Sequence, residues 1–384
     1  MRYDFDRVVK RRGTDSVKWA RYGQDVLPLW VADMDFPSPE PVVEALRRRI
    51  EHGVFGYGVE LDELRAVLQE RILVQHGWRV EQEDMVFVPG VVVGFNLVCQ
   101  AFGGEGDGVL IQPPVYPPFF SVGERTRRRI ETAPLVLTSE GYRIDFDAFE
   151  AAISPRTRVF LLCNPHNPVG RVFTRTELEK LAEICLRHDL IICSDEIHQD
   201  FVYPGHRHIP IASLGPEVAK RTITLVAPSK SYNIPGFHLS FALAPEPLRD
   251  RLKAACRGLI PGHSGVLDQV AALAAYKEGN EWLEQLLAYL RGNRDFVLAY
   301  VRNHLPGIEM LEPQGTYLAW LDCRGTGIQG PPGEFFLREA KVALNEGSFF
   351  GRNGEGFVRL NFGCPRPILQ EALERMKRAL EALG

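Results

Sequence analysis

The stretch TITLVAPSKSYNIPG, residues 222–236, decides how the rest of the chain is interpreted. Its first five residues, Thr222 to Val226, are apolar or β-branched, which predicts a buried strand. Lys230 follows four residues after that strand ends. A strand of this kind brings the next side chains into a crevice, where a desolvated lysine amine can act as a nucleophile. Most lysines after a strand are ordinary residues, so the interpretation depends on other stretches of the chain.

Two more polar stretches follow apolar, strand-like runs. They are NPHNPVG at residues 164–170 and SDEIH at residues 194–198. In an open α/β sheet, ligands bind outside the carboxyl ends of the strands. We therefore expect Asn167, Asp195 and Lys230 to lie together at one rim of the sheet.

The order of the predicted elements indicates the fold class. Predicted strands cover residues 85–88, 109–111, 158–163, 190–194, 222–226, 317–322 and 357–362, and predicted helices cover residues 38–50, 61–72, 174–188, 268–277, 282–305 and 367–383. Strands that alternate with helices predict an α/β fold with a mostly parallel, doubly wound sheet. The last third of the chain is typical of a smaller α+β domain. We expect a large domain at residues 46–281 and a small domain at residues 1–45 and 282–384, with an N-terminal arm.

Composition excludes some classes of protein and partner. The 384 residues are 45% hydrophobic and 24% charged, as in globular proteins. The formal net charge of -4 argues against nucleic acid as the main partner. Seven scattered cysteines without a C-x-x-C pair suit a reducing compartment, and we expect no metal site. No segment is long enough to span a bilayer, so we expect a cytoplasmic protein without a membrane partner.

A glycine turn follows the strand predicted at residues 85–88. Its backbone N–H groups at Gly90, Val91 and Val92 precede an apolar run that begins at Phe95. Strand, glycine turn and helix start in this order can surround a phosphate. Most turns of this kind are only turns, so both interpretations stay open.

An amide, a carboxylate and an amine at one rim suit pyridoxal phosphate. Its aldehyde needs a lysine, its ring nitrogen needs a carboxylate to stay protonated, and its phenolic oxygen needs a donor such as Asn167. Tyr116 is a candidate for the flat side chain beneath the ring. Taken singly, Asp195 could be a helix cap and Tyr116 could be core packing, but their joint placement favours the cofactor.

With these motifs in sequence order, the chain resembles the fold type I pyridoxal-phosphate enzymes of the class I/II aminotransferase group. Within that group it looks most like the MalY/PatB-type C–S lyases, which are cystathionine β-lyases. The matching stretches are WVADMDF (30–36), FGY (55–57), CNPHNPVG (163–170), SDEIH (194–198), SKSYNI (229–234), YLAWLD (317–322) and GFVRLNFGCP (356–365). They extend over nearly the whole chain, so the resemblance is specific although each motif alone is not.

The resemblance implies a role for each matching position. Lys230 would bind the cofactor aldehyde as a Schiff base and later move protons at the substrate Cα. Asp195 would pair with the ring nitrogen, Asn167 with the phenolic oxygen, and Tyr116 would stack on the ring. Arg359 would bind the substrate α-carboxylate through its planar fork, which a lysine could not reproduce.

The resemblance also implies the surroundings of the cofactor phosphate and of the substrate. Ser229 would add a hydroxyl to the backbone N–H donors of residues 90–92. Tyr57 would reach from one subunit to the cofactor phosphate and substrate of the other, which implies a homodimer with composite active sites. Ala32 and Asp33 would border a small amino-acid substrate.

Two positions depart from the wider aminotransferase pattern. His198, expected to contact the cofactor, stands where aspartate aminotransferases carry a tyrosine, and an Asp-Glu-Ile-His run is usual in the C–S lyase branch. His238 stands where many relatives carry a phosphate-binding arginine. This second departure leaves more of the phosphate binding to backbone N–H groups and Tyr57.

The resemblance implies α,β-elimination of a thiolate from a cysteine S-conjugate such as cystathionine, which yields thiol, pyruvate and ammonia. The main alternative is an aminotransferase, which shares the first steps, and no residue separates the two on physical grounds alone. Another alternative is a lyase that also modulates transcription by protein contact, because some relatives restrain an activator in this way. The chain shows no helix-turn-helix or basic stripe for direct DNA binding.

Overall fold

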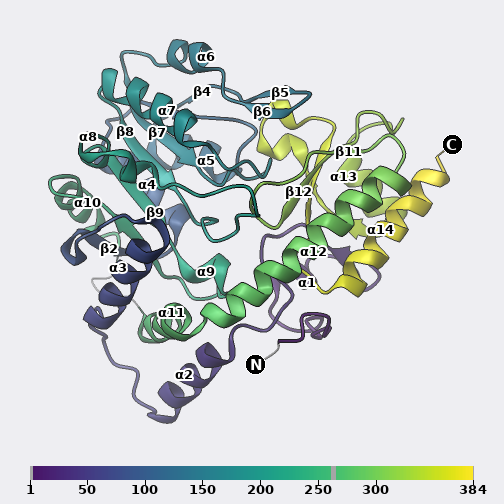
Figure 1. Ribbon diagram of the computed structural model, residues 1–384, viewed down its shortest axis with the longest axis horizontal. Coiled ribbons are helices and arrows are strands. Elements are labelled where there is room, and N and C mark those ends of the chain that lie inside the picture. Colours follow the sequence, from purple (N-terminus) through teal and green to yellow (C-terminus); the bar gives the residue numbers. More distant parts are fainter. Residues whose placement is uncertain (1–2, 261–264, 384) are drawn as a thin grey trace.

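A seven-stranded sheet forms the centre of the larger half of the molecule (Figure 1). The computed structural model describes residues 3–260 and 265–383. In spatial order the strands are β2 (Met85–Val88), β10 (Ser240–Leu243), β9 (Thr222–Val226), β8 (Ile191–Asp195), β7 (Thr157–Cys163), β3 (Gly108–Ile111) and β4 (Arg129–Thr132). The five strands from β9 to β4 are parallel, and β10 is antiparallel to both of its neighbours. The prediction of a mostly parallel sheet is confirmed.

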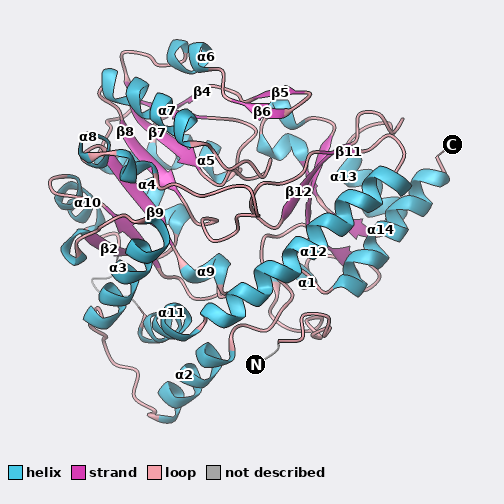
Figure 2. Ribbon diagram, viewed as in Figure 1, coloured by secondary structure: helices cyan, strands magenta, loops and turns pink. Residues whose placement is uncertain are grey.

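Helices cover both faces of this sheet (Figure 2). Successive residues of a strand point to opposite faces, so Leu161 and Cys163 join one buried cluster while Phe160 and Leu162 join another. The first cluster includes α4 (Val91–Ala101), α5 (Pro118–Thr126) and α10 (Leu248–Cys256), and the second includes α6 (Phe146–Ala151) and α7 (Arg175–Arg187). Because β8 and β9 are buried at every residue, only the side chains at or just beyond their carboxyl ends can meet a ligand.

Local sequence accounts for several helix boundaries. Thr174 and Glu177 form the expected capping box at the start of α7. Helix α4 begins at Val91, immediately after Gly90, and thus earlier than the apolar run at Phe95 suggested. The remaining helices of the larger half are α2 (Glu40–Glu51), α3 (Asp62–His76), α8 (Pro216–Ala219), α9 (Pro228–Ser231) and α11 (Val266–Glu278), with short 3₁₀ turns at Gln82–Asp84 and Ile211–Leu214.

A second, antiparallel sheet lies in the C-terminal part of the chain. Its strands, in spatial order, are β11 (Glu309–Met310), β12 (Leu318–Asp322), β15 (Phe357–Asn361) and β14 (Asn345–Glu346). The long helix α12 (Asn280–His304) extends from beside α11 to this region, where it packs against α14 (Arg366–Glu381) (Figure 1). Shorter elements are α1 (Val17–Ala20), α13 (Pro332–Phe335), a π-helical turn at Phe336–Ala340 and 3₁₀ turns at Gly347–Phe350 and Arg352–Gly354. Strand β1 (Leu27–Pro28) pairs with β13 (Val342–Ala343), and β5 (Val136–Thr138) pairs with β6 (Gly141–Arg143).

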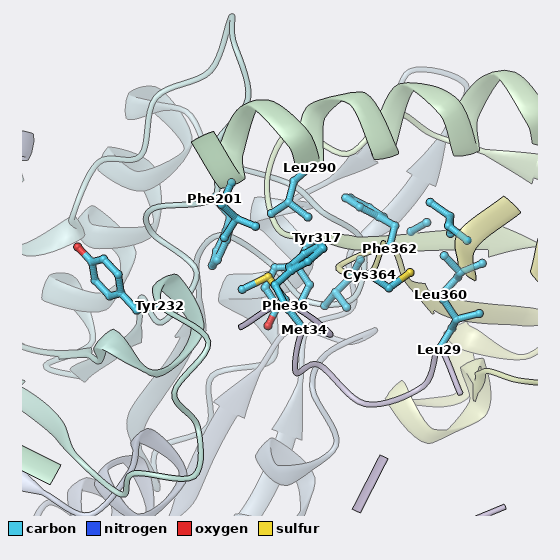
Figure 3. Packing of buried hydrophobic residues seen from close by; sticks show 14 of the residues in the cluster. Leu29, Met34, Phe36, Phe201, Tyr232, Leu290, Tyr317, Leu360, Phe362 and Cys364 are labelled. Atoms are coloured by element: carbon cyan, nitrogen blue, oxygen red, sulfur yellow. The ribbon is translucent and has the colours of Figure 1, made fainter. Parts of the chain in front are cut away.

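The N-terminal segment that contains Met34 and Phe36 packs between the two sheets. Figure 3 shows Met34 and Phe36 beside Tyr317 within one buried cluster. The side chain of Asn233, three residues after Lys230, accepts a hydrogen bond from the Met34 N–H and donates to the Met34 and Phe36 carbonyl oxygens at 2.8–2.9 Å. These bonds fix the segment against the loop that carries Lys230.

The expected domain boundaries stay a prediction. The boundary at residues 281 and 282 falls within α12, which joins the regions of the two sheets as one continuous helix. Among residues 3–260 and 265–383, no helix combines the length and the apolar character that crossing a bilayer requires.

Candidate active site

Six of the seven strands direct their carboxyl ends to the same edge of the large sheet. Strand β2 runs in the same direction as β9, because both are antiparallel to β10, and β7 and β8 are parallel to β9. A cavity of about 800 Å³ lies at this edge, and its lining includes Lys230, Tyr116, Arg359, Ala32 and Asp33. The structure thus brings these five predicted residues together at one cavity.

Lys230 lies in the one-turn helix α9, directly after β9. Its Nζ donates a hydrogen bond to the Ala32 carbonyl oxygen at 2.6 Å. Burial lowers the pKa of Lys230 to about 8, while the Asp33 carboxylate acts in the opposite direction. A substantial fraction of this amine is therefore unprotonated in mildly alkaline solution, which a nucleophilic lysine requires.

Asp195 is the last residue of β8, and 6% of its surface is exposed. Burial raises the pKa of its carboxyl group to about 7, although the Ile197 N–H donates to Oδ1 at 3.1 Å and lowers it in part. No cation lies within salt-bridge distance of this carboxylate in the described part of the chain. A protonated ring nitrogen would supply the missing positive charge.

Arg359 lies on β15 and is 4% exposed. Its guanidinium donates to the side-chain oxygens of Asn167 at 2.9 Å and Asn345 at 2.6 Å, and to the Trp30 carbonyl oxygen at 2.9 Å. The ring of Phe350 lies 4.9 Å from the guanidinium carbon. Burial lowers the pKa of Arg359 to about 10, since no Asp or Glu of the described residues pairs with it.

Asn167 lies between Arg359 and the carboxyl end of β7. Its Oδ1 accepts the bond from Arg359, and its backbone N–H donates to Cys163 Sγ at 3.5 Å. An amide oxygen that accepts from a guanidinium leaves the NH₂ group as a donor. That NH₂ group has no acceptor among the residues that the structure describes, so it can serve a phenolic oxygen.

Two ring side chains flank the rim. Tyr116 precedes α5 and lines the cavity, and burial raises the pKa of its hydroxyl. His198 is buried, with its ring centroid 5.8 Å from that of Tyr317. Burial lowers the pKa of His198 to about 3, and its Nδ1 has no hydrogen-bond partner within the described chain. A neutral imidazole with an unpaired nitrogen can bind a polar group of a ligand.

The predicted phosphate donors lie at the same sheet edge but outside the lining of the cavity. The predicted Gly90 N–H donor is already used, because it donates to the Val88 carbonyl oxygen at 2.8 Å. Gly90 has a φ of 102° and precedes α4, so the N–H groups of Val91 and Val92 belong to the unpaired first turn of that helix. Ser229 lies in α9, one residue before Lys230. Tyr57 is 100% exposed between α2 and α3 and does not line the cavity of its own chain.

Two residues at the site were not assigned a role from the sequence. Asn345, on the two-residue strand β14, lies opposite Arg359 in the strand register and also lines the cavity. The hydroxyl of Tyr317 donates to the Ala32 carbonyl oxygen at 2.7 Å, the same atom that accepts from Lys230. Tyr317 lies in YLAWLD (317–322), one of the stretches that carry the family resemblance. Nothing in the sequence around Asn345 indicated its position at the site.

These residues fit pyridoxal phosphate. The site offers an amine of lowered pKa, a buried carboxylate without a cation, and an amide donor without an acceptor, which match the aldehyde, ring nitrogen and phenolic oxygen. The start of α4 suits an anion such as a phosphate.

Comparisons with known proteins agree with this geometry. Residues 24–376 match the family described as aminotransferase class I and II. The chain belongs to this aminotransferase family. Cystathionine beta-lyase PatB of Bacillus subtilis (strain 168) is 40% identical to it over 98% of this chain and 100% of that protein.

Solved structures of similar proteins show the same fold. The crystal structure of OvoB is 44% identical over 98% of this chain and 99% of that chain, with a TM-score of 0.94. Cystalysin from Treponema denticola, whose crystal structure contains a pyridoxal 5'-phosphate cofactor, is 33% identical over 100% of both chains, with a TM-score of 0.96. The predicted membership of the class I/II aminotransferase group and the predicted fold are both confirmed.

Proposed function

We propose that this protein is a pyridoxal-phosphate-dependent carbon–sulfur β-lyase. It converts a cysteine S-conjugate such as cystathionine, with one water molecule, into a thiol, pyruvate and ammonia. Similar proteins support this reaction, since they include cystathionine beta-lyases of Bacillus subtilis and Corynebacterium glutamicum and a C–S lyase from Staphylococcus hominis.

One observation supports an amino-acid substrate most directly. Arg359 is a buried cation whose partners in the described chain are all uncharged oxygens. A buried charge without a counter-ion is costly, so such a site favours a ligand that brings one. The α-carboxylate of an amino acid supplies that charge and matches the planar guanidinium fork.

Five residues would hold the cofactor at this rim. Lys230 binds its aldehyde, Asp195 its ring nitrogen and Asn167 its phenolic oxygen, while Tyr116 stacks on the ring and His198 lies beside it. When bound, pyridoxal phosphate withdraws electrons from the Cα of an attached amino acid.

The residues of this chain then perform the proton transfers and the positioning. Arg359 would bind the substrate α-carboxylate in the same cavity that contains the amine of Lys230. Lys230, released from the cofactor when the substrate amine takes its place, would take the Cα proton as a general base, and the electron pair of that C–H bond would expel the sulfur from Cβ as a thiolate. Asp195 keeps the ring nitrogen protonated throughout. Water completes the breakdown to pyruvate and ammonia.

The phosphate and the second subunit complete the proposed site. Val54, Phe55, Tyr57 and Val59 are each more than half exposed, which makes the segment between α2 and α3 a protruding apolar surface. We infer that a second copy of the chain covers this segment and receives Tyr57 at its cofactor phosphate. The N–H groups of Val91 and Val92 and the hydroxyl of Ser229 would bind the same phosphate.

The location of the protein belongs to the same proposal. All seven cysteines are free, and six of them are buried. Cysteines in this state are typical of reducing compartments, which supports a cytoplasmic enzyme.

The decisive assay supplies cystathionine to the cofactor-loaded protein without a keto acid. A lyase releases thiol, pyruvate and ammonia in catalytic excess over enzyme. Turnover that stops after one equivalent, and resumes when a keto acid is added, would identify an aminotransferase instead.

A further inference from the structure

The positive charge of Arg359 is oriented by two asparagines rather than by a carboxylate. Asn167 accepts from Nη1 at 2.9 Å, and Asn345 accepts from Nη2 at 2.6 Å. A carboxylate at either position would orient the guanidinium equally well. It would also neutralise the charge and compete with any incoming carboxylate. An asparagine amide orients the guanidinium of Arg359 and leaves its positive charge available to a ligand.

The backbone determines which way Asn345 faces. Asn345 on β14 is the antiparallel register partner of Arg359 on β15, and side chains of directly opposed residues lie on the same face of a sheet. Both residues line the cavity that contains Lys230. The position of Asn345 therefore follows from the strand pairing, and not from a mobile loop.

The hydrogen bond between Arg359 and Asn345 leaves the NH₂ group of Asn345 unused. A guanidinium has only donors, so the amide oxygen of Asn345 must face it and the NH₂ group must point elsewhere. No hydrogen bond from this NH₂ group to an acceptor occurs in the described part of the chain. The equivalent group of Asn167 is assigned to the phenolic oxygen of the cofactor, whereas that of Asn345 has no assignment.

We propose that Asn345 is a second binding residue for the substrate α-carboxylate. Its oxygen orients Arg359 without neutralising it, and its NH₂ group donates to the carboxylate that Arg359 binds. This inference rests on the proposed function, because it assumes an α-amino acid as the ligand.

The test compares two ligands that differ only in the carboxylate. L-Alanine has no leaving group at Cβ, and ethylamine is the same molecule without its carboxylate. Binding of each to the cofactor-loaded protein is measured from the change in cofactor absorbance, which requires no turnover. Asn345→Asp keeps the shape of the side chain, replaces the donor by a carboxylate and gives Arg359 an internal ion pair.

Asn345→Asp should raise the dissociation constant of L-alanine by about tenfold to a hundredfold, as expected for a charge-assisted bond that is lost and replaced by repulsion. Asn345→Ala should raise it by about twofold to tenfold, because the same bond is lost but no repelling negative charge is added. Ethylamine should bind both variants as it binds the wild type. The exposed Asn303, changed to Asp, is the matched control for the added charge and should change neither constant.

Two results would overturn the inference: unchanged L-alanine binding in both variants, or equal weakening of L-alanine and ethylamine, which indicates a structural role. If Asn345→Asp does not fold, the ratio of the two constants in Asn345→Ala decides. Arg359→Ala is measured in parallel. If Arg359→Ala binds L-alanine more weakly while the Asn345 variants bind it normally, only this inference fails. If Arg359→Ala also binds L-alanine normally, the proposed carboxylate site fails as well.

Discussion

At the scale of single residues, burial without a matching charge distinguishes the site from the rest of the interior. Arg359 and Asp195 are both buried, and each lacks an oppositely charged partner within the described chain. Their pKa values move in the direction that reduces charge, to about 10 and about 7. An amino acid bound to a protonated cofactor would supply both missing charges. The cost of burying these two unpaired charges therefore argues that a ligand of complementary charge binds here.

Replacing Arg359 by alanine should weaken substrate binding far more than it slows chemistry. The loss should be about 2–4 kcal/mol, because a buried charge pair with the carboxylate disappears. The measurement is KM and kcat for cystathionine. Arg359→Lys serves as the control, since it keeps the charge but loses the fork and should recover only part of the affinity. A KM that stays at the wild-type value in the alanine variant would contradict the assignment.

Asp195 should make the stability of the cofactor-free protein depend on pH. Its folded pKa, about 7, lies above the ordinary value of 3.8. The folded state therefore binds a proton more tightly, so this contribution to stability is complete below about pH 4 and is lost as the pH rises through about 7. Thermal unfolding of the cofactor-free protein, followed from pH 4 to 8, should show this loss.

The Asp195→Asn variant provides the comparison for that measurement. It cannot ionise, so its stability should decrease less over the same interval of pH. Parallel curves for the two proteins would show that Asp195 does not titrate in this way.

At the scale of elements, the ends of the strands were predictable and the short irregular pieces were not. Strands β7, β8 and β9 are largely apolar, with polar residues at or just after their carboxyl ends, so these ends placed Asn167, Asp195 and Lys230 at one rim. Strand β14 has two residues, too few for a periodic signal. The position of Asn345 depends on its register with β15, which only the folded chain shows.

The start of α4 offers a test at this scale. Gly90 has φ 102° and ψ 147°, a region that residues with a Cβ rarely adopt. Gly90→Ala should lower the free energy of unfolding by about 1–3 kcal/mol and weaken the binding of pyridoxal phosphate, because the first turn of α4 shifts. The comparison is Gly215→Ala, where φ is 165° and a Cβ meets nothing within 4 Å. Equal effects of the two substitutions on cofactor binding would argue against the phosphate site.

At the scale of the whole molecule, the segment between α2 and α3 carries a predicted site residue away from the chain's own cavity. Tyr57 is fully exposed on the segment between α2 and α3. This position makes sense if two copies exchange their segments, and the sequence resemblance implied the same arrangement. The division of the chain into a large domain at residues 46–281 and a small domain at residues 1–45 and 282–384 also stays a prediction.

Tyr57→Phe should weaken cofactor binding by about 1.5–3 kcal/mol, the value of one hydrogen bond to a charged group, and leave a dimer intact. Sedimentation measures the dimer, and equilibrium titration measures the cofactor. A wild-type protein that sediments as a monomer while it binds cofactor at full affinity would refute the composite site.

The identity of the lysine that holds the cofactor tests the central claim most directly. The cofactor-loaded protein is reduced with sodium borohydride, digested, and analysed by mass spectrometry. The account predicts a pyridoxyl phosphate adduct on the peptide that contains Lys230, and none in Lys230→Ala. An adduct on a different lysine, or no adduct in a protein that takes up the cofactor, would contradict it.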